Sequence, residues 1–317
     1  MPSPEVKFAL KLASDAGRGV AALLAGIGDR LGLFSALAKG PASPDELAAR
    51  ASIDPRYARE WLHAMASAGY VERREGRYEL PPAQAEVLAH EGGGVFMGGT
   101  LQMLLGMVPI LPRLREAFVS GKGVPPEAYP PDAWEGMERD MAGLYETQLV
   151  SEWLPRVPAV RGLLEGGCLA ADIGCGRGRG ILTLAKAFPK ARFVGYDVYP
   201  PNVESASRKA RESSLSDRVR FEVRDASDGL PPADLAFTFD VVHDAAQPAK
   251  LASSIREASQ GSTGSSAVYA ARHVSGSAPS GLTGSKKKRA RPGYCDSFSI
   301  FSCTSGALAR TRSAGQS

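Results

Sequence analysis

The sequence predicts an α/β protein in which a doubly wound, mostly parallel sheet follows a helical N-terminal part. Three observations support this prediction. Between residues 168 and 258, apolar segments of strand length alternate with helical segments, as in a parallel sheet covered by helices. Before them, apolar residues recur at helical spacing. After residue 258 neither period persists, so we expect a sheet that is incomplete at its C-terminal edge.

The same patterns divide the chain into four expected regions. Residues 1–92 form a winged-helix domain of the dimerisation type, and residues 93–165 form connecting helices that line a substrate pocket. Residues 166–258 form the α/β domain, and residues 259–317 are a low-complexity, disordered tail.

The first region reads as a helix followed by a helix–turn–helix and a hairpin. Apolar residues at helical spacing run over 16–39. Ser43 and Glu46 have the spacing of a capping box, and Asp54-Pro55 fits the N-cap and first turn of a second helix. The segments "YVERR" and "RYEL" then pair across Glu75-Gly76. Together these elements make a winged-helix module.

Two interpretations of this module stay open. A DNA-reading helix presents Arg, Lys, Asn or Gln to base edges, and the second helix offers Arg56, Arg59 and His63. The same helix also carries Glu60 and Trp61, which suit packing better. We therefore favour a role in packing and homodimer formation over nucleic-acid binding.

Composition and charge exclude several function classes. The net charge is +4, but residues 259–317 hold eight Lys/Arg against one acid, so removing that +7 leaves −3 for the first 258 residues. The expected folded body is thus not basic enough to attract nucleic acid. No apolar run has the length of a membrane span, and no signal pattern is present at the N-terminus. The four cysteines lack metal-ligand spacing, so we expect reduced thiols in a cytoplasmic protein without a metal site.

The connecting helices are expected at residues 95–118 and 131–165, on either side of the Pro-rich "GVPPEAYPPDAW". Met97, Met103 and Met107 accompany several leucines there. A stripe of this kind is ordinarily core, although methionine also suits the wall of an apolar substrate pocket.

The α/β domain has strands expected at 168–173, 192–198, 219–226 and 234–242, and helices at 178–188, 200–213 and 247–258. In such sheets, ligands bind beyond the carboxyl ends of the strands. The first strand ends in "ADIGCGRGRG", which contains Asp172, Gly174, Gly176 and Gly178. The dinucleotide pattern G-x-G-x-x-G fails because Arg179 stands at its third glycine, and the P-loop pattern is absent. A carboxylate there would repel a pyrophosphate and suits a ligand that carries an ammonium group.

With these motifs the chain resembles the class I S-adenosylmethionine (SAM) dependent methyltransferases, which have a Rossmann-like fold, over about residues 165–258. The resemblance implies that Asp172, Gly174, Gly176 and Gly178 hold the methionine moiety of SAM. It also implies that "FVGYDV" supplies a ribose-binding carboxylate and that "FEVRDA" contacts the adenine. The further cofactor-binding residues expected from these strand ends are Asp197, Val198, Asp225, Ala226 and Asp240.

A second resemblance comes from "VVHDAAQPAKLASSIREA". Small-molecule O-methyltransferases of the caffeate type carry a His-Asp pair after the fourth strand and an N-terminal winged-helix dimerisation domain. This similarity implies that His243 is the catalytic base for a small-molecule methyl acceptor, with Asp244 positioning it. Ala245 stands where the family has tryptophan, so a structural or capping role for His243 stays open.

The pattern of these families stops after "SIREA". The last 59 residues contain 14 Ser and 8 Gly, and only "SSAVYAARHV" suggests a short strand. Our hypothesis is that the natural end has been replaced, which would leave "DLAFTFDVV" as an apolar edge strand and make "KKKRAR" an accident rather than a nuclear-import signal.

Two other functions compete with the enzyme. One is an interaction protein in which a winged helix is fused to a degenerate cofactor domain. The other is a nicotinamide dehydrogenase, which Arg179 disfavours. A measurement of SAM binding would distinguish the methyltransferase from these two alternatives.

Overall fold

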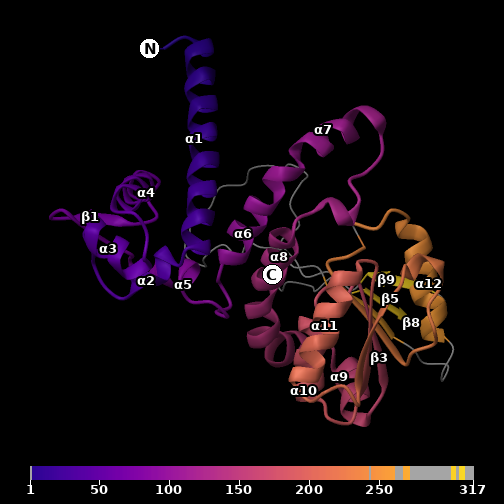
Figure 1. Ribbon diagram of the computed structural model, residues 1–317. Helices are drawn as coiled ribbons and strands as arrows, with labels where there is room; N and C mark the ends of the chain where they lie inside the picture. The colour runs from indigo at the N-terminus through magenta and orange to yellow at the C-terminus, as the bar shows by residue number, and fades with distance from the viewer. Residues whose placement is uncertain (1, 243, 261–266, 272–300, 305–306, 311–317) are drawn as a thin grey trace, which may run out of the picture. The chain divides into compact units, whose positions relative to one another are not determined.

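The computed structural model describes residues 2–242, 244–260, 267–271, 301–304 and 307–310. The chain divides into two compact units, residues 1–153 and residues 154–317 (Figure 1).

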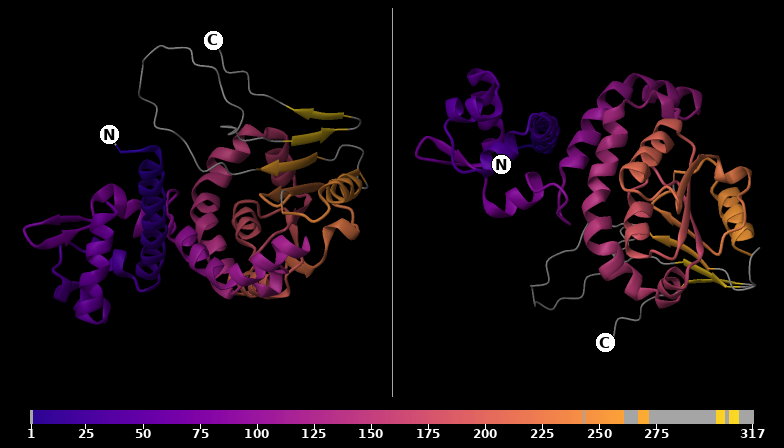
Figure 2. Two further views of the ribbon diagram at one scale, coloured as in Figure 1. Left: turned by 90° about the horizontal axis from the view of Figure 1, so that it is seen from above. Right: turned by 60° about the horizontal axis from the view of Figure 1, so that its bottom comes forward.

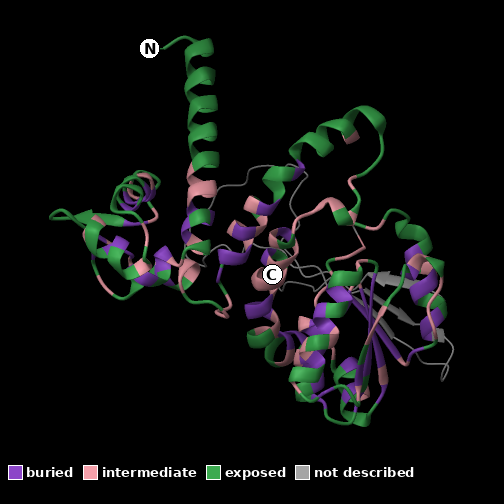
Figure 3. Ribbon diagram, in the orientation of Figure 1, coloured by how far each residue is buried: buried purple, intermediate pink, exposed green. Residues whose placement is uncertain are grey.

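The first unit begins with a long helix, α1 (Pro4–Arg30), followed by α2 (Leu33–Ala38). The apolar stretch 16–39 is therefore two helices, because Gly32 adopts a left-handed conformation with φ +68° between them. Residues 2–20 are all exposed, and this half of α1 carries no buried side chain (Figure 3). Neither α1 nor any other described helix is long and apolar enough to cross a membrane.

The winged-helix module has the two helices and the hairpin that the sequence predicted, namely α3 (Pro44–Ala51), α4 (Pro55–Ser67), β1 (Glu72–Arg74) and β2 (Arg77–Glu79). A further helix, α5 (Pro82–Leu88), follows the hairpin and was not predicted. The capping box is confirmed, since the Ser43 N–H donates to Glu46 and the Glu46 N–H donates to the Ser43 hydroxyl. Trp61 lies in the core of the module and donates from its indole N–H to the Leu24 carbonyl on α1 at 2.9 Å. The side chain expected on a packing helix is thus buried.

The helices that follow are α6 (Gly98–Met107), α7 (Leu111–Ser120) and α8 (Pro131–Leu144), and α8 continues as a π-helix over Tyr145–Trp153. Short 3-10 turns lie at Val108–Ile110 and Pro126–Ala128. Helices α6 and α8 pack closely, because a Cβ on Gly99 would lie 2.2 Å from the Asp140 nitrogen. No residue of α7 is buried.

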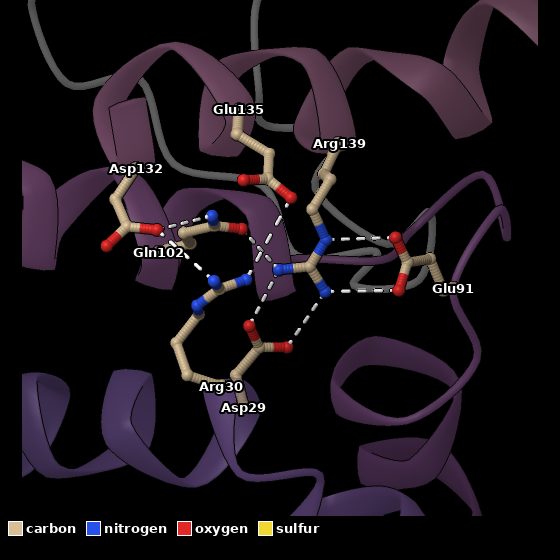
Figure 4. A network of polar contacts seen from close by, with 7 residues as sticks. All are labelled: Asp29, Arg30, Glu91, Gln102, Asp132, Glu135 and Arg139. Carbon is tan, nitrogen blue, oxygen red and sulfur yellow. Dashed lines mark hydrogen bonds and ion pairs between the residues drawn. The ribbon is translucent and has the colours of Figure 1, made fainter. Parts of the chain in front are cut away.

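A network of charged side chains ties α1, α6, α8 and the segment after α5 together (Figure 4). Its centre is Arg139 on α8, whose guanidinium donates to both carboxylate oxygens of Asp29, at 2.7 and 3.2 Å. The same guanidinium binds both oxygens of Glu91, at 2.9 and 3.1 Å, and the buried amide oxygen of Gln102 at 2.6 Å. Because the Asp29 side chain is only 5% exposed, Arg139 neutralises a charge that water cannot reach.

The second unit contains one parallel sheet. Its elements are η4 (Leu154–Arg156), α9 (Pro158–Gly166), β3 (Leu169–Ile173), α10 (Arg179–Ala187), β4 (Arg192–Asp197), α11 (Pro200–Glu212), β5 (Val219–Val223), η5 (Ala226–Asp228), β6 (Leu235–Phe239), α12 (Pro248–Gln260), β7 (Ala267–Ala271), β8 (Phe301–Thr304) and β9 (Ala307–Arg310). The first four strands and the three crossover helices lie where the sequence predicted them.

The strand order is β5-β4-β3-β6-β7, and all four pairings are parallel. Helices α10 and α11 cover one face of this sheet and α12 covers the other (Figures 1 and 2). The chain therefore leaves β3 toward β4 but leaves β6 in the opposite direction, toward β7. This reversal makes the boundary between β3 and β6 the topological switch point, where ligands bind in such sheets.

One sequence expectation about this sheet is wrong. Strand β6 is not its edge, because β7 pairs with it in parallel from Leu235 to Phe239. The pairing segment lies within "SSAVYAARHV", where valine and tyrosine favour a strand inside the Ser- and Gly-rich region. Strands β8 and β9 form a separate antiparallel hairpin, so three short strands lie in the region expected to be a disordered tail. "KKKRAR" and most of that region lie outside the described residues.

The Arg139 network generates the first prediction. Replacing Arg139 by methionine should lower the free energy of unfolding by about 3 kcal/mol, because Asp29 is left charged and buried. Arg30→Met is the control, since the Arg30–Asp132 pair is about half exposed and should contribute less than about 1 kcal/mol. Urea denaturation followed by circular dichroism measures both variants, and equal losses would contradict the special role of Arg139.

Candidate functional site

The candidate site starts at the carboxyl end of β3, where the chain turns from strand to helix within five residues. Three of these residues are glycines in the left-handed region: Gly174 at φ +71°, Gly176 at φ +54° and Gly178 at φ +83°. Residues with a Cβ rarely adopt this conformation, so the glycine repeat is what lets α10 begin directly above the strand.

The three glycines lie in different surroundings. A Cβ on Gly174 would come within 2.5 Å of Val241, and one on Gly178 would come within 2.8 Å of Ala206 and Phe221. A Cβ on Gly176 would meet nothing within 4 Å. Gly174 and Gly178 therefore permit close packing inside the protein, whereas Gly176 borders an open space that a ligand can enter.

Asp197, at the end of β4, fastens this turn to the neighbouring strand. Its carboxylate accepts hydrogen bonds from the Gly176 N–H at 2.8 Å and from the Tyr199 N–H at 2.9 Å, with the Asn202 amide at 3.5 Å. Burial raises the pKa of Asp197, while these three hydrogen bonds act in the opposite direction.

Asp172 lies on the adjacent strand in a poorer environment. It is 2% exposed, and its Oδ1 is buried without a hydrogen-bond partner. Burial, with the charge of Asp197 as a second cause, raises the pKa of Asp172 well above its usual range. Burial and both carboxylates likewise raise the pKa of the Cys175 thiol. The site thus holds two acidic groups, of which only Asp197 is satisfied.

The residues expected at the adenine lie at the next two strand ends. Val198 follows β4 and is 53% exposed. Asp225 follows β5, is exposed, and accepts a hydrogen bond from the Ser227 N–H at 2.8 Å, which begins the short helix η5. Ala226 beside it is buried. Asp225 thus lies at the carboxyl edge of the sheet, like Asp172 and Asp197.

The segment after β6 completes the switch point. Asp240 is exposed and adopts a left-handed conformation with φ +55°, which Asp tolerates better than most residues. This turn directs Val241 onto Gly174, and the Asp244 N–H then donates to the Val241 carbonyl at 3.0 Å. His243, the expected base, lies outside the described residues.

Sequence reasoning missed three contributors to this site. Val241 looked like a residue of the fourth strand, but it fills the space above Gly174. Asn202 is a buried polar residue in the first turn of α11 that faces Asp197, and a polar residue five positions after a strand-end acid gives little signal. Gly195 lies within β4, where a Cβ would come within 2.7 Å of the Cys175 sulfur. A glycine inside an apolar strand is a recognisable sign of such a close approach.

The residues present fit a cofactor with a positively charged amino group. Asp172 offers a buried carboxylate oxygen without a partner, and Gly176 leaves open space beside the same turn. Among the described residues no cluster of three His, Cys, Asp or Glu could hold a metal ion. Together with the strand order, this arrangement is that of an α/β methyltransferase with a SAM site.

Comparisons with known proteins agree with this class. Residues 19–90 match the Rv2258c-like winged HTH domain, and residues 171–260 match the methyltransferase domain. The chain is 32% identical over 239 residues to the N,N-dimethyltransferase OxyT of Streptomyces rimosus, covering 72% of this chain and 68% of that protein. It is 29% identical to the tetracenomycin polyketide synthesis 8-O-methyl transferase TcmO of Streptomyces glaucescens, covering 67% of this chain and 63% of that protein.

The fold is also similar to solved structures. An O-methyltransferase family protein from Burkholderia thailandensis superposes with a TM-score of 0.60 at 19% identity, covering 86% of this chain and 80% of the other. At this identity the likeness concerns the fold alone. Taken with the relatives above, it shows that the chain belongs to the SAM-dependent methyltransferases that carry an N-terminal winged-helix domain.

The glycine turn generates the second prediction. Gly176→Ala should weaken SAM binding at least about tenfold, because its methyl group enters the open space, while the left-handed backbone costs about 1 kcal/mol of stability. Gly178→Ala is the matched comparison and should cost about 2–4 kcal/mol, because its methyl group also collides with Ala206 and Phe221. Calorimetric titration and urea denaturation measure the two effects. Wild-type SAM affinity in Gly176→Ala would refute the assignment of this space to the cofactor.

Proposed function

We propose that this chain transfers the methyl group of SAM to a hydroxyl oxygen of a small, mainly apolar molecule. The observation that carries the proposal is the unpartnered buried carboxylate of Asp172 beside the open space at Gly176. Membership of the methyltransferase family supports it, as does the relative named as an 8-O-methyl transferase of polyketide synthesis. The interaction-protein alternative is not favoured, because the cofactor site retains its features.

The residues of the second unit would divide the cofactor among them. Asp172 and Gly176 would hold the methionine end, and Asp197 would accept hydrogen bonds from the ribose hydroxyls. Val198, Asp225 and Ala226 would border the adenine, because Val198 presents an exposed apolar side chain and Asp225 an exposed carboxylate. Asp240 would lie near the same site from the end of β6. When bound, SAM supplies a methyl group that its sulfonium charge activates toward nucleophiles.

His243 would act as the base that removes the acceptor proton. In the sequence it comes two residues after Val241, which contacts Gly174. A hydroxyl becomes a better nucleophile as it loses its proton, so a neutral imidazole within reach would assist the transfer. Asp244 would position the imidazole.

An amino nitrogen is the second candidate acceptor. It is favoured by the 32% identical relative, which is named as an N,N-dimethyltransferase. A neutral amine carries its own lone pair and gains less from a base than a hydroxyl does. A base at His243 would therefore matter more for an oxygen acceptor than for a nitrogen acceptor.

The third prediction tests this function. Wild-type protein should bind SAM in a calorimetric titration and methylate phenolic acceptors in a screen of hydroxyl and amine pairs that share one ring system. His243→Ala should lower the turnover of hydroxyl acceptors by about 100-fold while leaving SAM affinity unchanged. Equal turnover of the variant and the wild type would exclude a base at His243, and failure of wild-type protein to bind SAM would refute the proposed function.

We also propose that the protein is a homodimer formed through its first unit. The exposed half of α1 carries large apolar side chains that a monomer leaves in water, namely Val6, Phe8, Leu10 and Leu12, each 48–66% exposed. Exposed apolar surface of this extent is typical of a protein–protein interface. Two arginines of the hairpin are ion-paired, Arg74 with Glu72 and Glu79 and Arg77 with Glu46, which supports this use of the winged helix over nucleic-acid binding.

The fourth prediction follows from the exposed helix. Light scattering should give twice the chain mass of 33.4 kDa for the wild type. Replacing Phe8 and Leu12 together by glutamate should shift the protein to the monomer, because these residues lie one turn apart on the same face of α1 and two charges would be buried in the interface. Arg18→Glu changes an exposed residue later on the same helix and should leave the dimer intact. A monomeric wild type, or an unchanged double variant, would refute this interface.

A further inference from the structure

Asp172 and Asp197 form a pair of neighbouring carboxylates whose environments differ sharply. Asp197 accepts three hydrogen bonds from Gly176, Tyr199 and Asn202. Asp172 is 2% exposed against 9% for Asp197, yet its Oδ1 accepts none. Two buried charges of the same sign cannot both be maintained cheaply, so the proton resides on the group whose charge is less stabilised.

No ion pair or hydrogen bond of the described residues stabilises a charge on Asp172 Oδ1. Its direct neighbours across the sheet are Gly195 on β4 and Phe237 on β6, and neither ionises. The ionisable residues of the glycine turn, the start of α10 and the adjoining strand ends include Cys175, Arg177, Arg179, Tyr196, Asp197 and Asp240. Of these, Asp197 is the charge that acts on Asp172, and it raises the pKa of Asp172 further.

We infer that Asp172 carries a proton in the cofactor-free site and exchanges it for the ammonium group of the cofactor. This inference rests on the proposed function, because it takes the bound molecule to be SAM or its demethylated product, S-adenosylhomocysteine. The neutral carboxyl group loses its proton to the solvent as the ammonium group arrives, and a carboxylate–ammonium pair replaces the carboxyl group. The carboxylate–ammonium pair has no net charge, like the carboxyl group that it replaces.

The exchange makes Asp172 a specificity-determining residue. A ligand that brings its own positive charge stabilises the ionised Asp172, whereas an adenosine derivative without the amino acid moiety leaves the proton in place. Such a ligand therefore keeps its contacts with Asp197 and gains nothing from Asp172. The site accordingly selects for the amino acid end of the cofactor through charge as well as through shape.

The direction of the pH dependence follows from the same exchange. Because the pKa of Asp172 is raised in the folded protein, its protonated form stabilises the cofactor-free protein. That contribution is fully present below the ordinary pKa of an aspartate and is lost as the pH rises through the raised value. Ligand binding has the opposite pH dependence, because it requires the ionised form of Asp172. The affinity for S-adenosylhomocysteine therefore falls as the pH drops through the raised pKa, at the limit by about tenfold per pH unit.

The test is a calorimetric titration of S-adenosylhomocysteine at several pH values from about 5.5 to 7.5, each in phosphate and in imidazole buffer. These buffers differ in their heat of ionisation, so the difference in measured enthalpy counts the protons released. We expect a net release of protons that is largest where the pH lies below the raised pKa of Asp172. The matched ligand is 5′-methylthioadenosine, which has the nucleoside and the thioether but no ammonium group and should release none. Equal release with both ligands, or none with either, would overturn the inference.

Variants assign the proton to a residue. Asp172→Asn should abolish the release and raise the thermal stability of the cofactor-free protein, because asparagine is neutral without taking up a proton on folding. Asp228→Asn removes an exposed carboxylate of the same unit that pairs with Lys250, and it should leave the release unchanged. Release that persists in Asp172→Asn would overturn the assignment. If that variant binds too weakly to titrate, the comparison of the two ligands on the wild type decides.

The outcomes separate this inference from the proposed function. A wild-type protein that binds both ligands without exchanging a proton would overturn the inference and leave the methyltransferase function intact. A folded wild type that binds neither ligand would overturn both.

Discussion

The second unit depends on one backbone constraint, the left-handed turn that joins β3 to α10. Because three of its residues lack a Cβ, the chain can reverse from strand to helix and still let Val241, Ala206 and Phe221 pack against it. The same turn places the Gly176 N–H on the Asp197 carboxylate, at 2.8 Å. The packing of the sheet and the proposed cofactor site therefore depend on the same turn.

In the first unit the comparable constraint is a buried ion pair. Asp29 is buried near the end of α1, and Arg139 binds it from α8 with two hydrogen bonds while also binding Glu91 and Gln102. Such a centre fixes the directions of several helices at once, because the planar guanidinium has its donors in set positions. The ion pair thus fixes the C-terminal end of α1, while the N-terminal half of the helix is exposed.

Much of this architecture could be predicted from the sequence because its signals are local. The capping box at Ser43, the strand and helix periods and the acids at the strand ends each depend on neighbouring residues. Features that join distant residues could not be predicted. Arg139 and Asp29 are 110 positions apart, and nothing near Val241 indicates that it meets Gly174. The pairing of β7 with β6 was missed because the Ser- and Gly-rich composition of the surrounding region outweighs five strand-forming residues.

The contact between Val241 and Gly174 has a consequence for how such an enzyme can change. One side of this contact belongs to the glycine turn of the proposed cofactor site, and the other belongs to the segment that leads to the proposed base His243. A substitution that reshapes the segment after β6 to accept a different molecule would displace Val241 and so disturb the glycine turn as well. New acceptor preferences in this chain would therefore require paired substitutions, or would arise more readily from residues that do not touch the switch point.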